Sequence, residues 1–266
     1  MSSHASEDHR AVKKPCVFEP YKKYKNIGKC LIISNEHFPG APHLHRAGCS
    51  VDENLLSRMF QSLGFHVQLE KNLTAKQMVA ALTKVAKDNH ADMSCFVCVL
   101  MSHGEEGTIL GSDQNWIPFK TLTSTMTSDL CPCLQGKPKL FFLQACRGSK
   151  YDPGVETDAS KELEEFMGMS DVPELDFLCC YSTAEGYYSW RNPDSGSIFI
   201  RELCKMFMDC HLEIIQILTR VNHRVANYFQ SYTTELETHK KKQMPCLASR
   251  LTKDFYLHMP VKKNNF

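Results

Sequence analysis

Two short polar motifs, each placed directly after an apolar run, could supply a nucleophile and a base. Cys146 lies in QACRG (144–148) after the apolar residues 140–143, and His103 lies in SHG (102–104) after the apolar residues 95–101. If both runs are buried parallel strands, the two side chains emerge at strand carboxyl ends, where open α/β sheets form their sites. We therefore expect the thiol and the imidazole to be neighbours, as nucleophilic catalysis by cysteine requires.

Such a pair could hydrolyse a peptide bond. A free thiol has a pKa of about 8.5, so only a few per cent is thiolate at neutral pH unless an imidazole or a cation favours that form. His103 could take the thiol proton and return it to the leaving amine, after which water hydrolyses the thioester. The N–H groups of Gly104 and Cys146 are candidate oxyanion donors, worth roughly 3 to 4 kcal/mol. With unperturbed pKa values near 8.5 and 6.5, activity should be bell-shaped around neutrality.

Composition excludes several classes of function. The 266 residues carry a net charge of +1, which gives no reason to expect binding to nucleic acid or to an anionic membrane. No apolar window approaches the roughly 18 to 20 residues that span a bilayer, and no secretory signal pattern opens the chain. Thirteen cysteines, an odd number, favour reduced thiols. We expect a cytoplasmic protein without a cofactor.

The periodicity of apolar residues predicts alternating strands and helices. Strands are expected at 30–34, 66–69, 95–101, 140–143 and 177–181, with one or two more within 247–257. SVDE (50–53) and TAKQ (74–77) are capping boxes that should open two helices, the first of which should stop at Gly64. Two further helices are expected within 199–229, with a break near 210–211. This succession predicts an α/β domain with a parallel sheet and helices on both faces.

Two polar segments lie outside this pattern. Residues 1 to about 26 lack a clear period and are expected to form a short mobile arm. Residues 149–176 hold nine acidic residues against two lysines, with prolines and glycines that interrupt regular structure. We expect an exposed loop here, and VETDA (155–159) within it is an attractive site for proteolysis.

Metal binding is the competing use of the cysteines. Cys95 and Cys98, and likewise Cys131 and Cys133, have suggestive spacings. The first pair lies in an expected buried strand where the side chains would diverge, and no nearby Cys or His pair completes four ligands. We therefore predict no metal site.

The chain resembles the caspase family, most closely its executioner group. The likeness runs from about residue 27 to 258 and covers RAGCSVD (46–52), MSHGEEG (101–107), QACRG (144–148), YYSWRN (187–192) and QMPC (243–246). It implies the caspase-like (caspase-hemoglobinase) fold, with a mostly parallel six-stranded sheet between helices. It also implies a large-subunit region at 27–158, a processed linker at 159–176 and a small-subunit region at 177–266.

The resemblance assigns roles to individual residues. Cys146 would be the nucleophile and His103 the acid/base, with Gly104 contributing to the oxyanion hole. Arg46, Gln144 and Arg191 would line the pocket for the residue before the scissile bond, and two guanidiniums there favour a carboxylate, hence aspartate. Further substrate contacts are implied for Tyr188, Ser189, Trp190 and Asn192. Lone arginines are more often solvated surface cations, and aromatic residues more often pack in cores, so the motif context carries these assignments.

Two departures from the family pattern leave other functions open. Ile198 stands where a tryptophan is usual, and Thr238 where an aromatic residue often closes a pocket. They put substrate preference beyond aspartate in question and motivate one alternative, a catalytically silent relative that acts as a binding partner. A second alternative, cleavage after Arg or Lys, requires an acidic pocket where this chain offers arginines.

The resemblance also implies activation and assembly. Asp158 matches the family's inter-subunit processing site, so the chain would be a zymogen cut by an upstream protease, and Asp171 is a candidate second cut. Expected partners are proteins with exposed Asp-containing loops, inhibitor proteins, and a second copy paired through an edge strand within 247–257.

Overall fold

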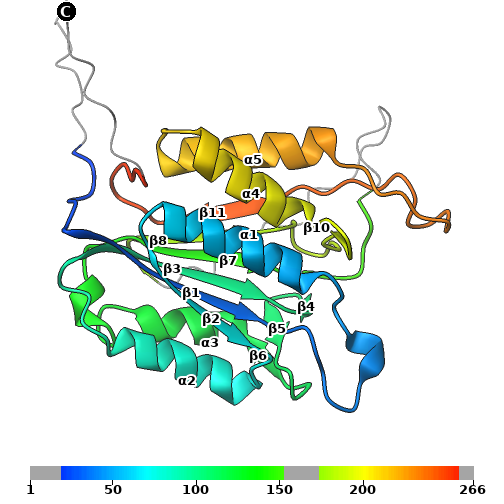
Figure 1. The fold of residues 1–266 in the computed structure, drawn as a ribbon, viewed down its shortest axis with the longest axis horizontal. Coiled ribbons are helices and arrows are strands. Elements are labelled where there is room, and N and C mark those ends of the chain that lie inside the picture. Colours follow the sequence, from blue (N-terminus) through cyan, green and yellow to red (C-terminus); the bar gives the residue numbers. More distant parts are fainter. Residues whose placement is uncertain (1–18, 153–173, 258–266) are drawn as a thin grey trace, which may run out of the picture.

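The structure, a computed structural model, describes residues 19–152 and 174–257 and has three layers around one sheet (Figure 1). The sheet has six strands in the order β11-β8-β7-β3-β1-β2, of which β11 alone is antiparallel to its neighbour. In chain order the strands are β1 (Asn26–Ser34), β2 (His66–Lys71), β3 (Met93–Met101), β7 (Lys139–Gln144), β8 (Phe177–Tyr181) and β11 (Cys246–Ser249). The predicted mostly parallel six-stranded sheet is confirmed.

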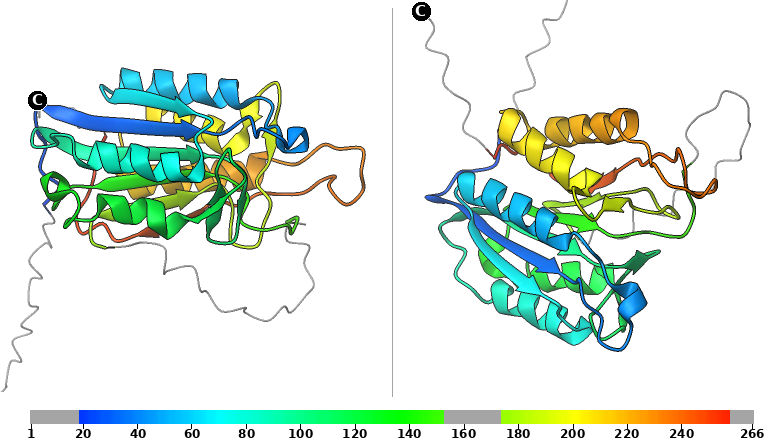
Figure 2. Two further views of the ribbon diagram at one scale, coloured as in Figure 1. Left: turned by 90° about the horizontal axis from the view of Figure 1, so that it is seen from below. Right: turned by 45° about the vertical axis from the view of Figure 1, so that its right-hand side comes forward.

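Helices cover both faces of this sheet (Figure 2). One face carries α1 (Cys49–Ser62), α4 (Ile198–Asp209) and α5 (Ile214–Tyr228), and the other carries α2 (Ala75–Ala86) and α3 (Phe119–Thr123). Each face has its own apolar core, because side chains alternate along a strand. Cys95 belongs to one core and Cys98 to the other, so their thiols diverge as expected.

Short elements extend the loops at the carboxyl ends of the parallel strands. A small sheet is formed by β4 (Gly104–Glu105), β5 (Thr108–Leu110) and β6 (Trp116–Pro118), and a hairpin by β9 (Arg191–Asn192) and β10 (Gly196–Ser197). The described residues also form the 3₁₀ turns η1 (Pro42–Leu44), η2 (Ser124–Met126) and η3 (Pro132–Leu134).

Two predicted helix boundaries are confirmed and one is wrong. Thr74 and Gln77 form both hydrogen bonds of a capping box at the start of α2, and Gly64 follows α1 with φ +87°. The box at 50–53 does not form, because α1 begins at Cys49 after Gly48, whose φ is +85°. A Cβ on Gly48 would lie 2.6 Å from Pro193 O, so packing against a distant loop sets this helix start.

The structure describes residues 19–25 and 174–176, which belong to the two segments predicted to be mobile or exposed. Tyr21 is buried, donates a 2.5 Å hydrogen bond to Asp176 and bonds through its N–H to Asp254 O. Residues 19–25 and 174–176 therefore pack on the body, because a buried phenol and a carboxylate satisfy one another across the two segments. Within the described part of residues 247–257 there is one strand, β11. None of the described helices is long and apolar enough to cross a membrane.

Candidate active site

The carboxyl ends of β3 and β7 bring His103 and Cys146 to one place. Met101 pairs with Gln144 in the parallel register, so the two motifs leave adjacent strands at the same level of the sheet. His103 and Cys146 both line a cavity of about 750 Å³. The neighbourhood expected from two apolar runs is thus present in the structure.

Close approach between the two motifs requires Gly104. A Cβ at this position would lie 2.5 Å from Cys146 O and 2.8 Å from the Cβ of Ala145. Both distances are far inside van der Waals contact, so any larger residue would push the two loops apart. The glycine therefore sets the separation between the imidazole loop and the thiol loop.

The imidazole of His103 is held by a backbone carbonyl. Its Nε2 lies 2.7 Å from Leu44 O, and because a carbonyl can only accept, Nε2 donates and Nδ1 is the acceptor of the neutral ring. Burial lowers the pKa of His103 below its ordinary 6.5, the Leu44 hydrogen bond opposes this, and the charges of Arg46 and Arg191 lower it further. At neutral pH the ring is therefore an unprotonated base.

The thiol of Cys146 is protonated before substrate arrives. Burial raises its pKa above 9.0, against the opposing effects of the Ser189 N–H and of the cations Arg46 and Arg191. The Ser189 N–H donates to Sγ over 3.4 Å. A neutral thiol beside a neutral imidazole transfers its proton as attack begins.

The two arginines singled out in the sequence converge on one sulfur atom. Arg46 is buried and donates through Nη1 to Asn35 O at 2.8 Å and to Cys49 Sγ at 3.2 Å. Arg191 Nη1 lies 4.0 Å from the same Sγ. Burial, with repulsion from Arg191, lowers the pKa of Arg46 to about 10, which leaves it charged at neutral pH. The arrangement concentrates two positive charges near Cys146.

A buried carboxylate, Asp52, lies among these charges. Its oxygens accept from the N–H and the hydroxyl of Ser197 at 2.9 and 2.8 Å. Burial raises its pKa to about 6, and the Ser197 hydrogen bonds, Arg46 and Arg191 hold it lower than burial alone would. Sequence reasoning treated Asp52 as part of a helix cap and missed this position. The sequence signal that could have identified Asp52 is its position six residues after Arg46.

Gln144 is held beside the thiol by two serines. Its Nε2 donates to Ser189 Oγ at 2.9 Å, and Ser189 Oγ donates to Ser182 Oγ at 2.8 Å. Gln144 Oε1 is buried and accepts no hydrogen bond from the described residues. Gln144 and Ser189 thus lie together next to Cys146.

Aromatic rings form a wall beside the cavity. Tyr188 and Trp190 pack edge to face at 5.2 Å, and Tyr151 packs on both, at 5.5 and 5.7 Å. Gln243 secures the wall, because its Oε1 accepts from Trp190 N at 2.8 Å and its Nε2 donates to Ser182 O at 2.6 Å. Sequence reasoning missed Tyr151, which follows Cys146 by five residues, and gave Gln243 no role.

The remaining predicted positions have other surroundings. The side-chain oxygen of Asn192 accepts from Asp194 N and Ser195 N, so it stabilises its own turn. Ile198 is buried at the start of α4, and Thr238 Oγ1 lies 2.7 Å from Thr233 Oγ1. Asp158 and Asp171 lie outside the described residues.

Comparison with known proteins shows the family of this chain. A family model described as "Caspase domain" matches residues 27–256. Caspase-7 of Gallus gallus is 45% identical over 90% of this chain and 80% of its own length, and caspase-3 of Mesocricetus auratus is 45% identical over 88% and 85%. The crystal structure of caspase-1 from Spodoptera frugiperda superposes with a TM-score of 0.80 and 32% identity, covering 89% of this chain and 94% of that one. The chain therefore belongs to the caspase family, as a cysteine-type, aspartate-specific endopeptidase of the executioner type that acts in apoptosis.

Proposed function

We propose that Cys146 is the nucleophile and His103 the acid/base of this endopeptidase. The observation that carries the proposal is their position at the ends of adjacent strands on one cavity, with Nδ1 of His103 left as the acceptor. His103 takes the thiol proton while sulfur attacks the carbonyl, and gives it to the leaving amine. The N–H groups of Gly104 and Cys146 stabilise the oxyanion.

Arg46, Arg191 and Gln144 bind the aspartate before the scissile bond. Both guanidiniums are within 4.0 Å of Cys49 Sγ, so one carboxylate can accept from both. Such a pocket does not suit Arg or Lys, since it would place three cations together. This arrangement favours aspartate over a basic residue.

The segment 188–192 binds the residues that precede this aspartate. Ser189 and Arg191 pair with the peptide backbone, and Tyr188 with Trp190 forms an apolar wall. Asn192 contacts the fourth residue before the cut through its amide nitrogen, since its oxygen is used by the turn. Support comes from the position of this segment beside Cys146.

The chain is a cytoplasmic zymogen with the regions 27–158, 159–176 and 177–266, and it is activated when an upstream protease cuts after Asp158. Asp171 is a second cutting site. Activation pairs two copies through β11, which lies at an edge of the sheet and has one neighbour, β8, among the described strands. The partners are proteins with exposed Asp-containing loops and proteins that inhibit the enzyme.

The test uses matched fluorogenic peptides with Asp, Asn or Arg before the cut. The protein cut at Asp158 should cleave the Asp peptide, and Cys146→Ala should reduce the rate by about 10⁴-fold or more. Cys133→Ala, which removes an exposed thiol, is the control and should keep the rate. Turnover that survives in Cys146→Ala would refute the assignment, and absence of turnover in the wild type would favour the silent relative.

A further inference from the structure

The small sheet of β4, β5 and β6 turns one face to the core and the other to the cavity. Side chains directly opposite one another on antiparallel strands lie on the same face, and the next pair along lies on the other face. Gly104, Ile109 and Ile117 are paired in this way, and all three are buried. Ile109 and Ile117 belong to the apolar core on the side of α2 and α3. The neighbouring positions of the same strands therefore face outward.

The outward face places an acidic and an aromatic side chain beside the imidazole of His103. Leu110 pairs with Trp116, and the N–H of Leu110 donates to His103 O at 2.9 Å. Glu105 follows His103 by two residues, so alternation puts both side chains on one face. His103, Glu105, Leu110 and Trp116 all line the cavity of about 750 Å³, in agreement with this alternation.

This part of the cavity is acidic. Glu105 and Glu106 both line it, and both are exposed. Among the described residues, neither carboxylate has an ion-pair or hydrogen-bond partner. Trp116 is 45% exposed, and the described residues that line the cavity include no lysine or arginine. The side chain of a lysine or arginine would meet unpaired carboxylates and the face of an indole ring, and both attract a cation.

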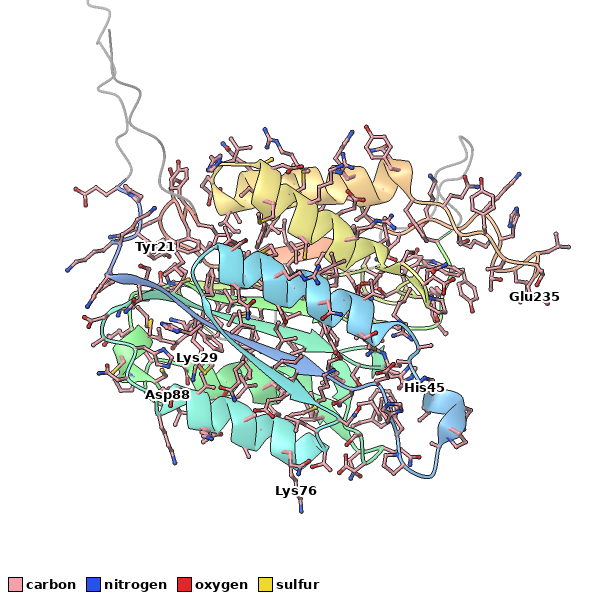
Figure 3. The ribbon with its side chains drawn as sticks, viewed as in Figure 1. Tyr21, Lys29, His45, Lys76, Asp88 and Glu235 are labelled. Carbon is pink, nitrogen blue, oxygen red and sulfur yellow. The ribbon has the colours of Figure 1, made fainter. Side chains whose placement is uncertain are left out.

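A small apolar cluster holds this wall of the cavity in place. Leu110 is buried in the cluster and Leu44 packs against it, and its other members are Phe38 and Ala41. Figure 3 shows His45, which follows Leu44 in the chain, at the end of the molecule where β1 ends (Figure 1). Because the wall is packed from beneath, a ligand would not have to order it.

The position of His103 fixes the direction in which a substrate crosses the cavity. As proposed above, His103 protonates the leaving amine, so the first residue after the cut lies against the imidazole. The segment 188–192 is assigned to the residues before the cut, and the residues after it therefore continue over the outward face of the small sheet. Ideal strand geometry places the Cα of Glu105 about 7 Å and the Cα of Trp116 about 10 Å from that of His103. An extended peptide advances about 3.4 Å per residue, so these distances correspond to the second and third residues after the cut.

We propose that Glu105 and Trp116 form a subsite that prefers lysine or arginine at the second or third position after the cut. This inference rests on the proposed function, because the role of His103 gives the direction of the substrate. Arg46 and Arg191 make the aspartate pocket positive, whereas this subsite is negative. A substrate with an acidic residue before the cut and a basic residue after it is therefore bound in one orientation.

The kinetic test uses internally quenched peptides that are identical up to the aspartate and carry either Arg or Gln at the second and third positions after the cut. For the protein cut at Asp158, kcat/KM should be about fivefold higher for the Arg peptide. Glu105→Gln and Trp116→Leu should each lower this ratio, and the double variant should bring it to about one. A ratio within one variant cancels any general loss of activity. Asp209→Asn is the matched control, because it removes the same charge from an exposed position outside the cavity, and it should keep the ratio.

Binding separates a failure of this inference from a failure of the proposed function. Cys146→Ala, cut at Asp158 by an added protease, should bind the Arg peptide about fivefold more tightly than the Gln peptide in calorimetry. Adding Glu105→Gln and Trp116→Leu should remove the difference. If the wild type cleaves neither peptide, the proposed function fails, and the affinities still decide the subsite. Cleavage of both peptides with equal kcat/KM and equal affinity would leave the proposed function intact and overturn the subsite.

Discussion

The residues to which we assign the chemistry (His103 and Cys146, the reacting region) and those to which we assign substrate selection (Arg46 and the segment 188–192, the selecting region) are held in different ways. His103 and Cys146 follow β3 and β7, whose register fixes them through the backbone of the central sheet. Tyr188 and Trp190 lie on a segment after β8 that has a few backbone contacts, such as Tyr188 N to Lys150 O at 2.8 Å, and that the side chain of Gln243 anchors at Trp190. A sheet built from apolar runs tolerates many substitutions, whereas a loop held by a few polar contacts depends on each of them.

Loss of Arg46 should have the largest effect, and it should change substrate selection far more than the chemistry. Arg46→Leu removes a buried guanidinium that we place on the substrate carboxylate, so kcat/KM for an Asp peptide should fall by about 10²-fold or more. The Asp-over-Asn preference should collapse, while the small residual rate on the Asn peptide changes less. Arg220→Leu, on the exposed face of α5, is the control. An equal loss on both peptides would mean that Arg46 is structural.

Gly104→Ala should damage the reacting region and leave selection intact. The added methyl would lie 2.5 Å from Cys146 O, so the imidazole and thiol loops must separate. We expect kcat to fall by about 10 to 10²-fold with an unchanged preference for aspartate. Gly107→Asn is the control, because Gly107 has a positive φ of +67° but nothing within 4 Å of an added Cβ. An effect as large in Gly107→Asn would show that any side chain added to this loop lowers kcat, and that the clash at Cys146 O is not the cause.

Gln243→Met should act on the selecting region alone. It leaves Trp190 N and Ser182 O without their partner, which should cost about 1 to 3 kcal/mol of unfolding free energy. KM should rise several-fold with little change in kcat, because β3 and β7 keep their places. Gln216→Met on α5, an exposed position, should change neither quantity. A fall in kcat without a rise in KM would contradict the division between the regions.

The same contrast explains what could be predicted from sequence. Strands β3, β7 and β8 were recognised because uninterrupted apolar runs have few other stable places in a domain, and their ends then located Cys146 and His103. The predicted start of α1 was wrong because the helix begins after Gly48. A glycine is needed there because the backbone of Pro193, nearly 150 residues away in the chain, leaves no room for a Cβ. The roles that we propose for Arg46 and Gln144 came from resemblance, since no local pattern connects the two residues.

Positions that act through long-range polar contacts had no periodic signal. Asp52 looks like any acidic residue in a first helical turn, and its contact with Ser197 exists only after α1 and α4 pack. Gln243 and Tyr151 likewise acquire their roles from the loops they meet. The residues at strand ends can therefore be predicted from sequence more readily than the contacts between loops.

The pH dependence should show the smallest effect of these tests, and it discriminates most sharply between groups that titrate in the reacting region. Burial lowers the pKa of His103 and raises the pKa of Cys146. The neutral imidazole and the neutral thiol therefore coexist over a wider pH range than they would as free side chains. The acid limb of kcat/KM should therefore fall below pH 6.5, and the alkaline limb above about 9. Asp52, whose pKa is raised to about 6, also titrates in this range, and its protonation would weaken its contact with Ser197. Asp52→Asn removes that titration and should leave the acid limb in place. If the limb disappears in Asp52→Asn, the acid limb reports the carboxylate between the arginines and not the imidazole.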